Sequence, residues 1–269
     1  MLGYTCGMTD SDREPFSKSK LVSMREKWSE PDQTKGQTWE FDGVAHDPEH
    51  WMGYSHEMRE GLGMFGCKTF DKLTSYLREK LNRKPNVVDL MGGAYFLDFP
   101  ENVGSLVGIR IHDKDTDFLE VSKKSKSERA WLLEKIIQSP NRRVIEADIL
   151  TNAGWRVIKG ENLPLADLVV CRPGGPFDVE HATVSRFDNP AIYAGLYTSL
   201  FRRMLKLVNK ESGVVFTEIP DIFSDTEIDN FFVGIDKSEK SRTKVFTVPD
   251  VDYHWGGKKR KYAVVQFGN

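Results

Sequence analysis

From residue 68 onward, the chain alternates apolar, strand-like runs with amphipathic helical segments, and this alternation constrains its fold most. Five runs are dense in Val, Ile and Leu, and they span residues 86–92, 105–111, 142–150, 166–173 and 213–220. Continuous apolar runs of this kind are typical of parallel strands with helices on both faces. The alternation therefore predicts an α/β fold with a doubly wound, right-handed, Rossmann-like sheet.

The segments between these runs carry signals for helix starts. Asn189 followed by Pro190 suits an N-cap and a first helical position. Ser224 and Glu227 have the spacing of a capping box, in which each side chain bonds the backbone of the other residue. We expect helices at residues 70–81, 127–139, 189–208 and 224–232.

The last part of the chain departs from the alternation. Residues 244–267 read as two strand-like runs around Gly256 and Gly257, which is typical of an antiparallel hairpin. Adding the hairpin to the five parallel strands predicts a seven-stranded sheet. A dinucleotide-dependent dehydrogenase would be expected to continue with parallel strands instead.

The N-terminal segment is polar, aromatic and only weakly periodic. We expect residues 1–67 to form a partly irregular cap or arm on a main domain at residues 68–269. The stretch His46–Trp51 holds two histidines and two carboxylates, which are types of metal ligand. Pro48 separates the two histidines, so no helix can present them together, and a polar loop without a metal is the favoured interpretation.

Composition bounds the function. Hydrophobic residues make up 39% and charged residues 29%, as in globular proteins, and the formal net charge of -2 argues against a general affinity for nucleic acid. The three cysteines lack C-x-x-C spacing, which suits a reducing compartment. We find no signal-peptide pattern and no run near the ~20 apolar residues of a membrane span. A cytoplasmic protein without a membrane partner is expected.

The stretch NVVDLMGGAY joins the first apolar run to a glycine turn. Asp89 ends the run with a hydrogen-bond acceptor, and Gly92 and Gly93 let the backbone turn tightly beside a ligand. Met91 and Tyr95 stand where nucleotide-binding turns commonly have glycine. Because ligands of open α/β sheets bind beyond the carboxyl ends of the strands, this loop is expected to hold a cofactor. A tight turn without a ligand is the alternative.

The order and spacing of these elements resemble the class I S-adenosylmethionine-dependent methyltransferases. In that family an acidic residue and a glycine-rich turn follow the first strand, and Asp89 and Gly93 match those positions. Asp148, in VIEADIL, matches the residue that contacts the adenine amino group. The resemblance implies S-adenosylmethionine as the cofactor. The cofactor-binding residues that it implies are Asp89, Gly92, Gly93, Ala94, Arg110, Asp148, Ile149 and Cys171.

Arg110 departs from the family pattern, which has an acidic residue there to bind the ribose hydroxyls. Arginine cannot accept a hydrogen bond. In one interpretation, Arg110 turns to solvent while Asp113 or Asp115 replaces the acid. In another, the fold no longer binds its cofactor in the usual pose. In the third and least favoured, Arg110 binds the 2′-phosphate of NADP.

The fourth strand leads into CRPGGPF, residues Cys171–Phe177, where the family places its loop beside the reacting methyl group. Methyl transfer is an in-line displacement, so the enzyme mainly aligns the reactants and excludes water. We expect Arg172 and Pro173 to serve the reaction, with proline as a flat wall and arginine holding an anionic group of the acceptor. A surface ion pair is the alternative for Arg172. Cys171 is expected to be buried rather than nucleophilic.

The sequence thus favours an S-adenosylmethionine-dependent methyltransferase whose acceptor is a small molecule, a protein or an RNA. The second hypothesis is a catalytically degenerate methyltransferase fold that acts as a binding or scaffold subunit, and the third is an NADP-linked oxidoreductase. The basic stretch Lys258–Lys261 would suit a phosphate backbone, but solvated charges at a hairpin tip explain it equally well, so nucleic acid is not favoured as a partner.

Overall fold

A computed structural model describes residues 58–97, 99–110, 136–172, 190–220, 223–248 and 260–268. Several predicted features lie outside these ranges. They are most of the helix at 127–139, the stretch His46–Trp51, the hairpin turn at Gly256 and Gly257, and the residues Pro173, Asp113, Asp115, Lys258 and Lys259.

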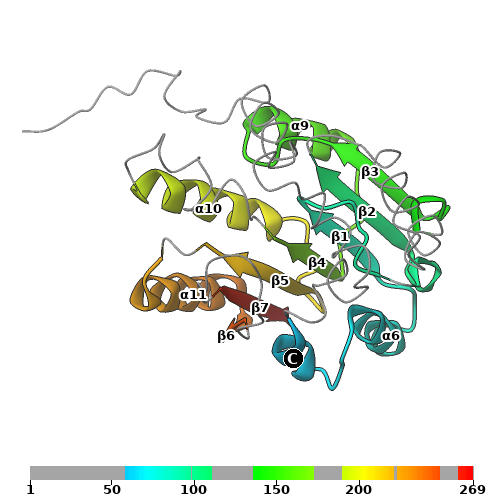
Figure 1. Cartoon of the computed structure of the whole chain (residues 1–269), viewed down its shortest axis with the longest axis horizontal. Helices are drawn as coiled ribbons and strands as arrows, with labels where there is room; N and C mark the ends of the chain where they lie inside the picture. Colours follow the sequence, from blue (N-terminus) through cyan, green and yellow to red (C-terminus); the bar gives the residue numbers. More distant parts are fainter. Residues whose placement is uncertain are drawn as a thin grey trace, which may run out of the picture.

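The sheet has seven strands in the order β3-β2-β1-β4-β5-β7-β6 (Figure 1). The strands are β1 (Asn86–Leu90), β2 (Ser105–Arg110), β3 (Arg142–Glu146), β4 (Leu168–Cys171), β5 (Val214–Ile219), β6 (Ser241–Thr247) and β7 (Lys261–Phe267). The first five are parallel, whereas β7 runs antiparallel to both β5 and β6. The predicted doubly wound sheet and terminal hairpin are confirmed. The strand order reverses between β1 and β4, which is where open α/β sheets bind ligands.

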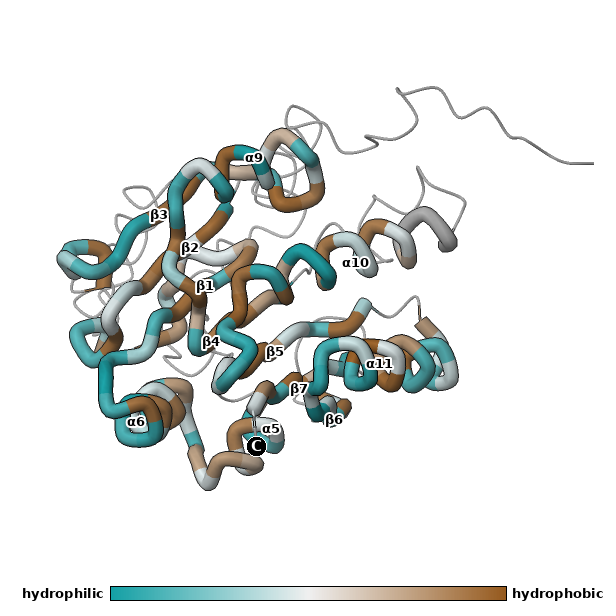
Figure 2. The backbone as a smooth tube through the Cα atoms, turned by 180° about the vertical axis from the view of Figure 1, so that it is seen from behind, coloured by the Kyte–Doolittle hydropathy of each residue, from teal (hydrophilic) through white to brown (hydrophobic). Residues whose placement is uncertain are grey.

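Helices cover both faces of the sheet. They are α5 (Arg59–Gly63), α6 (Phe70–Leu81), α9 (Asn152–Gly160), α10 (Pro190–Met204), α11 (Asp225–Glu239) and the 3-10 turn η2 (Pro100–Asn102). The core cluster on one face joins apolar residues of α9, α10 and α11 to the strands, and the cluster on the other face joins those of α5 and α6 (Figure 1). Hydrophobic segments recur at intervals along α6 and α11, as expected for helices with one buried side (Figure 2).

Local signals explain where these helices begin. The hydroxyl of Thr69 accepts a hydrogen bond from the Lys72 backbone at 3.3 Å, and Ser224 and Glu227 form the predicted capping box. We did not predict α9, which has only nine residues and too few buried positions to show a clear period. The predicted strand at 142–150 is too long, because β3 ends at Glu146 and a turn follows.

The described end of the N-terminal segment packs into the domain. In α5, Leu62 is buried, and the backbone N–H of Gly61 donates to the hydroxyl of Tyr262 on β7 at 2.9 Å. The first half of β7 therefore packs against α5. A boundary near residue 68 stays a prediction. No helix in the described part of the chain is long and apolar enough to cross a membrane.

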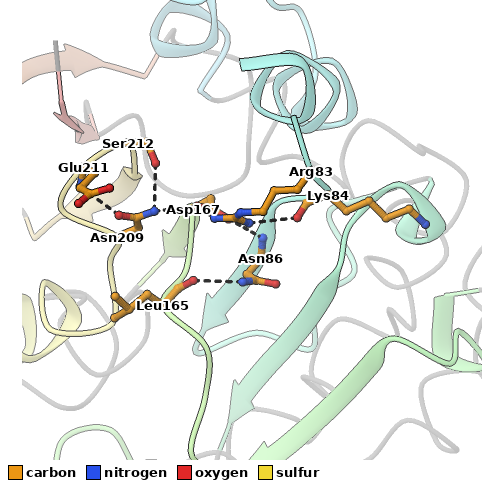
Figure 3. A network of polar contacts seen from close by, with 8 residues as sticks. All are labelled: Arg83, Lys84, Asn86, Leu165, Asp167, Asn209, Glu211 and Ser212. Carbon is orange, nitrogen blue, oxygen red and sulfur yellow. Dashed lines mark hydrogen bonds and ion pairs between the residues drawn. The ribbon is translucent and has the colours of Figure 1, made fainter. Parts of the chain in front are cut away.

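A polar network closes the amino-terminal edge of the sheet (Figure 3). The carboxylate of Asp167 is fully buried and accepts two hydrogen bonds from the Arg83 guanidinium, at 2.7 and 2.8 Å. It also accepts from the Asn86 backbone at 2.9 Å and from the Asn209 amide at 3.2 Å. The network ties the starts of β1 and β4 to the segment before β5, at the edge opposite the predicted cofactor loop.

Candidate functional site

Asp89 lies near the carboxyl end of β1 with its side chain 1% exposed. Its Oδ2 accepts a hydrogen bond from the Ala94 backbone at 2.8 Å, so the carboxylate holds the loop that follows the strand. Its Oδ1 is buried and has no hydrogen-bond partner among the residues that the structure describes. A buried carboxylate oxygen of this kind can accept a hydrogen bond from a ligand, and leaving it unsatisfied is unfavourable.

The loop keeps its tight path although two glycines of the family motif are missing. A Cβ on Gly92 would collide with the Asp89 carboxylate, so only glycine fits there. Met91 and Ala94 adopt φ of 71° and 62°, in the left-handed region that is unfavourable for residues with a side chain. Strained residues of this kind persist where the surrounding structure over-determines them, commonly at binding sites.

Two residues of neighbouring strands support the loop. A Cβ on Gly108 of β2 would lie 2.8 Å from the Gly92 carbonyl oxygen, so the loop rests directly on this strand. From β3, Arg142 donates to the Gly93 carbonyl oxygen with Nε at 3.0 Å and Nη2 at 2.8 Å. Its guanidinium also lies 4.9 Å from the centre of the Tyr95 ring, within the range of a cation–π contact.

Charged side chains of alternating sign form a row across the carboxyl edge of the sheet. Strand register and the period of two place five of them on the α6 face. In the spatial order of their strands they are Arg110, Asp89, Arg172, Glu218 and Arg260. The two described ion pairs join Glu218 to Arg172 at 3.9 Å and to Arg260 at 3.5 Å. We call these five residues the charged row.

Topology identifies the fold. The sheet has five parallel strands whose spatial order reverses between β1 and β4, followed by an antiparallel β7 inserted between β5 and β6. The antiparallel strand distinguishes it from the all-parallel dinucleotide-binding sheet. The chain has the class I methyltransferase fold.

Comparisons with known proteins find only relatives that are distant in sequence. No protein-family model matches the chain, and no curated protein matches it. Among solved structures, the plantazolicin methyltransferase BpumL in complex with SAH is 11% identical, with a TM-score of 0.46, covering 94% of this chain and 96% of that one. The methyltransferase domain of bacterial CtHen1 is 11% identical with a TM-score of 0.39, over 73% and 96% of the two chains. Precorrin-6y C5,15-methyltransferase from Geobacter metallireducens is 12% identical with a TM-score of 0.37, over 74% of this chain and 88% of that one.

Burial governs the protonation of Asp89. Desolvation raises the pKa of this carboxyl to about 7, although the Ala94 N–H bond and the guanidiniums of Arg172, Arg110 and Arg142 act in the opposite direction. The group therefore changes charge near neutral pH.

Arg110 is the last residue of β2. The side chain is half-buried, and its guanidinium lies 5.7 Å from the centre of the Tyr95 ring. It contacts Tyr95 of the loop, and the two acids expected to replace it, Asp113 and Asp115, lie outside the described residues. A guanidinium can still donate hydrogen bonds to hydroxyl oxygens, but it cannot accept from them.

Asp148 and Ile149 lie in the turn after β3. Asp148 is buried, and its Oδ1 accepts from the Leu150 backbone at 2.9 Å, which orients the carboxylate. The Trp155 indole donates to the Ile149 carbonyl oxygen at 2.6 Å, so α9 fixes the turn from one side. The turn thus lies at the same carboxyl edge as Asp89, two strands away.

Cys171 is fully buried, as predicted, and burial raises the pKa of its thiol. Its side chain packs in the core cluster that contains α10, on the face opposite Asp89. Only its backbone can therefore line the site. Arg172 follows at the carboxyl edge, whereas Pro173 lies outside the described residues. Within the described ranges, no three His, Cys, Asp or Glu side chains are grouped as metal ligands.

Sequence reasoning missed Gly108, Arg142 and Glu218. A glycine inside an apolar strand was an available signal, since it marks a close approach of another backbone. The other two gave no local signal, because their roles depend on which strands are neighbours.

Gly108→Ala should displace the cofactor loop, because the new methyl group would meet backbone atoms that cannot rotate away. We expect a loss of about 1–3 kcal/mol in the free energy of unfolding, measured by urea titration. Gly234→Ala is the matched control, since a Cβ there meets nothing within 4 Å in α11 and should stabilise the helix by about 0.5–1 kcal/mol. Equal stability of both variants would contradict the close packing.

Proposed function

We propose that this protein is an S-adenosylmethionine-dependent methyltransferase. The observation that carries the proposal is the buried Oδ1 of Asp89, which has no hydrogen-bond partner among the described residues and lies at the point where the strand order reverses. The tight path of the loop, which only glycine at position 92 permits, also supports the proposal. A glycine turn of this kind lets the backbone approach a ligand closely. The residues present fit the amino-acid end of this cofactor.

The cofactor would supply a methyl group on a sulfonium. In the proposed site, Asp89 accepts a hydrogen bond from the cofactor's ammonium group, and Gly92 and Gly93 let the loop pass close to the side chains of Asp89 and Tyr95. Asp148 binds the adenine amino group from the turn after β3. Arg172 orients the acceptor, and alignment with exclusion of water supplies the rate enhancement.

A binding or scaffold role is the second candidate, and Arg110 favours it. This arginine faces the loop at the position where the family has its ribose-binding acid. A site that replaces an acceptor by a donor loses the hydrogen bonds that the ribose hydroxyls would donate.

Calorimetric titration with S-adenosylhomocysteine tests the proposal, and NADPH is the control ligand. We expect micromolar affinity for S-adenosylhomocysteine and none for NADPH. If neither ligand bound, the scaffold role would become the better account. Binding of NADPH alone would replace the methyltransferase proposal by an oxidoreductase and would direct mutagenesis to Arg110.

The affinity for S-adenosylhomocysteine should rise with pH. With a pKa of about 7, Asp89 is mostly protonated at pH 6 and mostly ionised at pH 8. If only the carboxylate binds the ammonium group, the dissociation constant should fall about tenfold between these two values. Titrations at constant ionic strength measure the effect. A flat profile would place the ammonium group away from Asp89.

A further inference from the structure

Resting on the proposed methyltransferase function, we infer that Arg142 is a positioning residue for the cofactor loop, residues 91–95, and that it fixes the orientation of the peptide group between Gly93 and Ala94. Arg142 lies on β3, two strands away from the strand that the loop follows. It acts through the backbone that holds Asp89, and its role requires no contact with the cofactor or the acceptor.

The peptide group between Gly93 and Ala94 is held at both of its ends. Its carbonyl oxygen accepts hydrogen bonds from Nε and Nη2 of Arg142, at 3.0 and 2.8 Å. Its N–H donates to Oδ2 of Asp89 at 2.8 Å. Hydrogen bonds to ionised groups are stronger than those between neutral groups, and the guanidinium stays charged throughout the ordinary pH range. One peptide group therefore connects a side chain of β3 to a side chain of β1.

The orientation that these bonds hold is unfavourable for the backbone itself. Ala94 has a φ of 62°, in the left-handed region where the Cβ of an L residue crowds the following carbonyl oxygen. Rotation of the peptide plane by about half a turn would return this φ to the negative range that residues with a side chain prefer. The same rotation would break the bonds to Arg142 and Asp89. The two side chains thus maintain a conformation that the local backbone disfavours.

Strand register and one glycine bring Arg142 within reach of the loop. Arg142 pairs with Leu106, and Gly108 lies two residues further along β2 on the same face of the sheet. A Cβ at Gly108 would lie 2.8 Å from the Gly92 carbonyl oxygen and 3.0 Å from the Gly93 Cα. Because this side chain is absent, the loop lies directly on β2, where the guanidinium reaches it.

The Tyr95 ring gives Arg142 a second contact with the same loop. A Cβ at Gly93 would lie 2.4 Å from this ring, so the ring packs directly on the loop backbone. The guanidinium carbon of Arg142 lies 4.9 Å from the ring centre, within the range of a cation–π contact. The next residue differs, since Arg143 is on the opposite face of the strand and pairs with Glu161 at 3.1 Å.

The orientation of this peptide matters for the proposed site because it orients Asp89. With Oδ2 held by the Ala94 N–H, the plane of the carboxylate is fixed, and the position of Oδ1 is fixed with it. Oδ1 is the buried atom proposed to accept from the cofactor's ammonium group. Rotation of the peptide would release Oδ2 and allow the carboxylate to turn. Arg142 therefore positions the binding atom through the loop.

Hydrogen exchange of the Ala94 amide, followed by NMR in the ligand-free protein, tests the role of Arg142 in the loop. In Arg142→Gln this amide should exchange about tenfold faster, because a hydrogen bond to a charged group contributes about that factor. The amides of β4, in the middle of the sheet, should keep their rates. Arg143→Gln is the matched control and should change neither. Unchanged exchange of the Ala94 amide in Arg142→Gln would overturn the inference, and so would equal acceleration throughout β4.

Calorimetric titration with S-adenosylhomocysteine tests the consequence for binding. Arg142→Gln should weaken the affinity about tenfold. Arg142→Lys, which keeps the charge but not the planar fork, should weaken it less, and it is the variant to measure if Arg142→Gln does not fold. Unchanged affinity in both variants would show that Arg142 does not position the binding atom.

A rescue variant separates positioning from general destabilisation. Adding Ala94→Gly to Arg142→Gln should restore the affinity by about threefold, because glycine adopts a positive φ without the steric cost. A loss caused by general destabilisation would not be restored, and that result would contradict the inference. Failure of the proposed function would be seen separately, as no binding of S-adenosylhomocysteine to the unmodified protein. Exchange of the Ala94 amide would then still decide whether Arg142 holds the loop.

Discussion

Asp89→Asn is expected to weaken S-adenosylhomocysteine binding by about 100-fold, because it removes a charge-assisted hydrogen bond worth about 2–3 kcal/mol. Asparagine has nearly the same shape, and its side-chain oxygen can still accept from the Ala94 backbone, so the loop should keep its path. Calorimetric titration at pH 8 measures the loss. Undiminished affinity would remove Asp89 from the site.

The same substitution should stabilise the protein above neutral pH. Burial raises the folded-state pKa of Asp89 to about 7, so its contribution to stability is fully present below the unfolded pKa, near 3.8, and is lost as pH rises through 7. Asparagine has no such loss. We expect a gain of about 1–3 kcal/mol at pH 8 and little gain at pH 4, measured by urea titration at both values. Lower affinity together with higher stability would distinguish a binding carboxylate from a structural one.

Asp167→Ala should have the largest effect on folding and none on binding. It removes two bonds to Arg83 and one each to the Asn86 backbone and the Asn209 amide, all at the amino-terminal edge (Figure 3). We expect a loss of about 2–4 kcal/mol, because Arg83 is half-exposed and can be hydrated while the other partners lose a buried acceptor. Thermal unfolding and calorimetry measure the two properties.

Glu239→Ala is the control for that variant. It breaks the ion pair with Lys210 at 2.8 Å, in which both side chains are partly exposed, and such pairs contribute about 0–1 kcal/mol. If both variants lost the same stability, the buried network would have no special role. If Asp167→Ala also lost affinity for S-adenosylhomocysteine at a temperature where it is folded, the two edges of the sheet would be coupled.

Local sequence patterns determined much of the fold. Apolar runs located all five parallel strands, and a capping box located the start of α11, because these features depend on neighbours within a few residues. The short α9 escaped this reasoning, since nine residues with two buried positions show little periodicity. Asp89 and the glycine turn were also visible, because a strand end followed by a tight turn is a local event.

Tertiary structure alone decided how the site is built. Gly108 supports the loop, Arg142 holds the Gly93 carbonyl, and Glu218 lies between two arginines because of strand order and register, which join residues far apart in the chain. The protonation of Asp89 is likewise a property of its burial rather than of its residue type. The sequence by itself determined where the chain turns and which segments are buried. Which charged side chains face one another was decided only by the assembled sheet. Contacts between strands depend on their register, and no short stretch of sequence specifies that register.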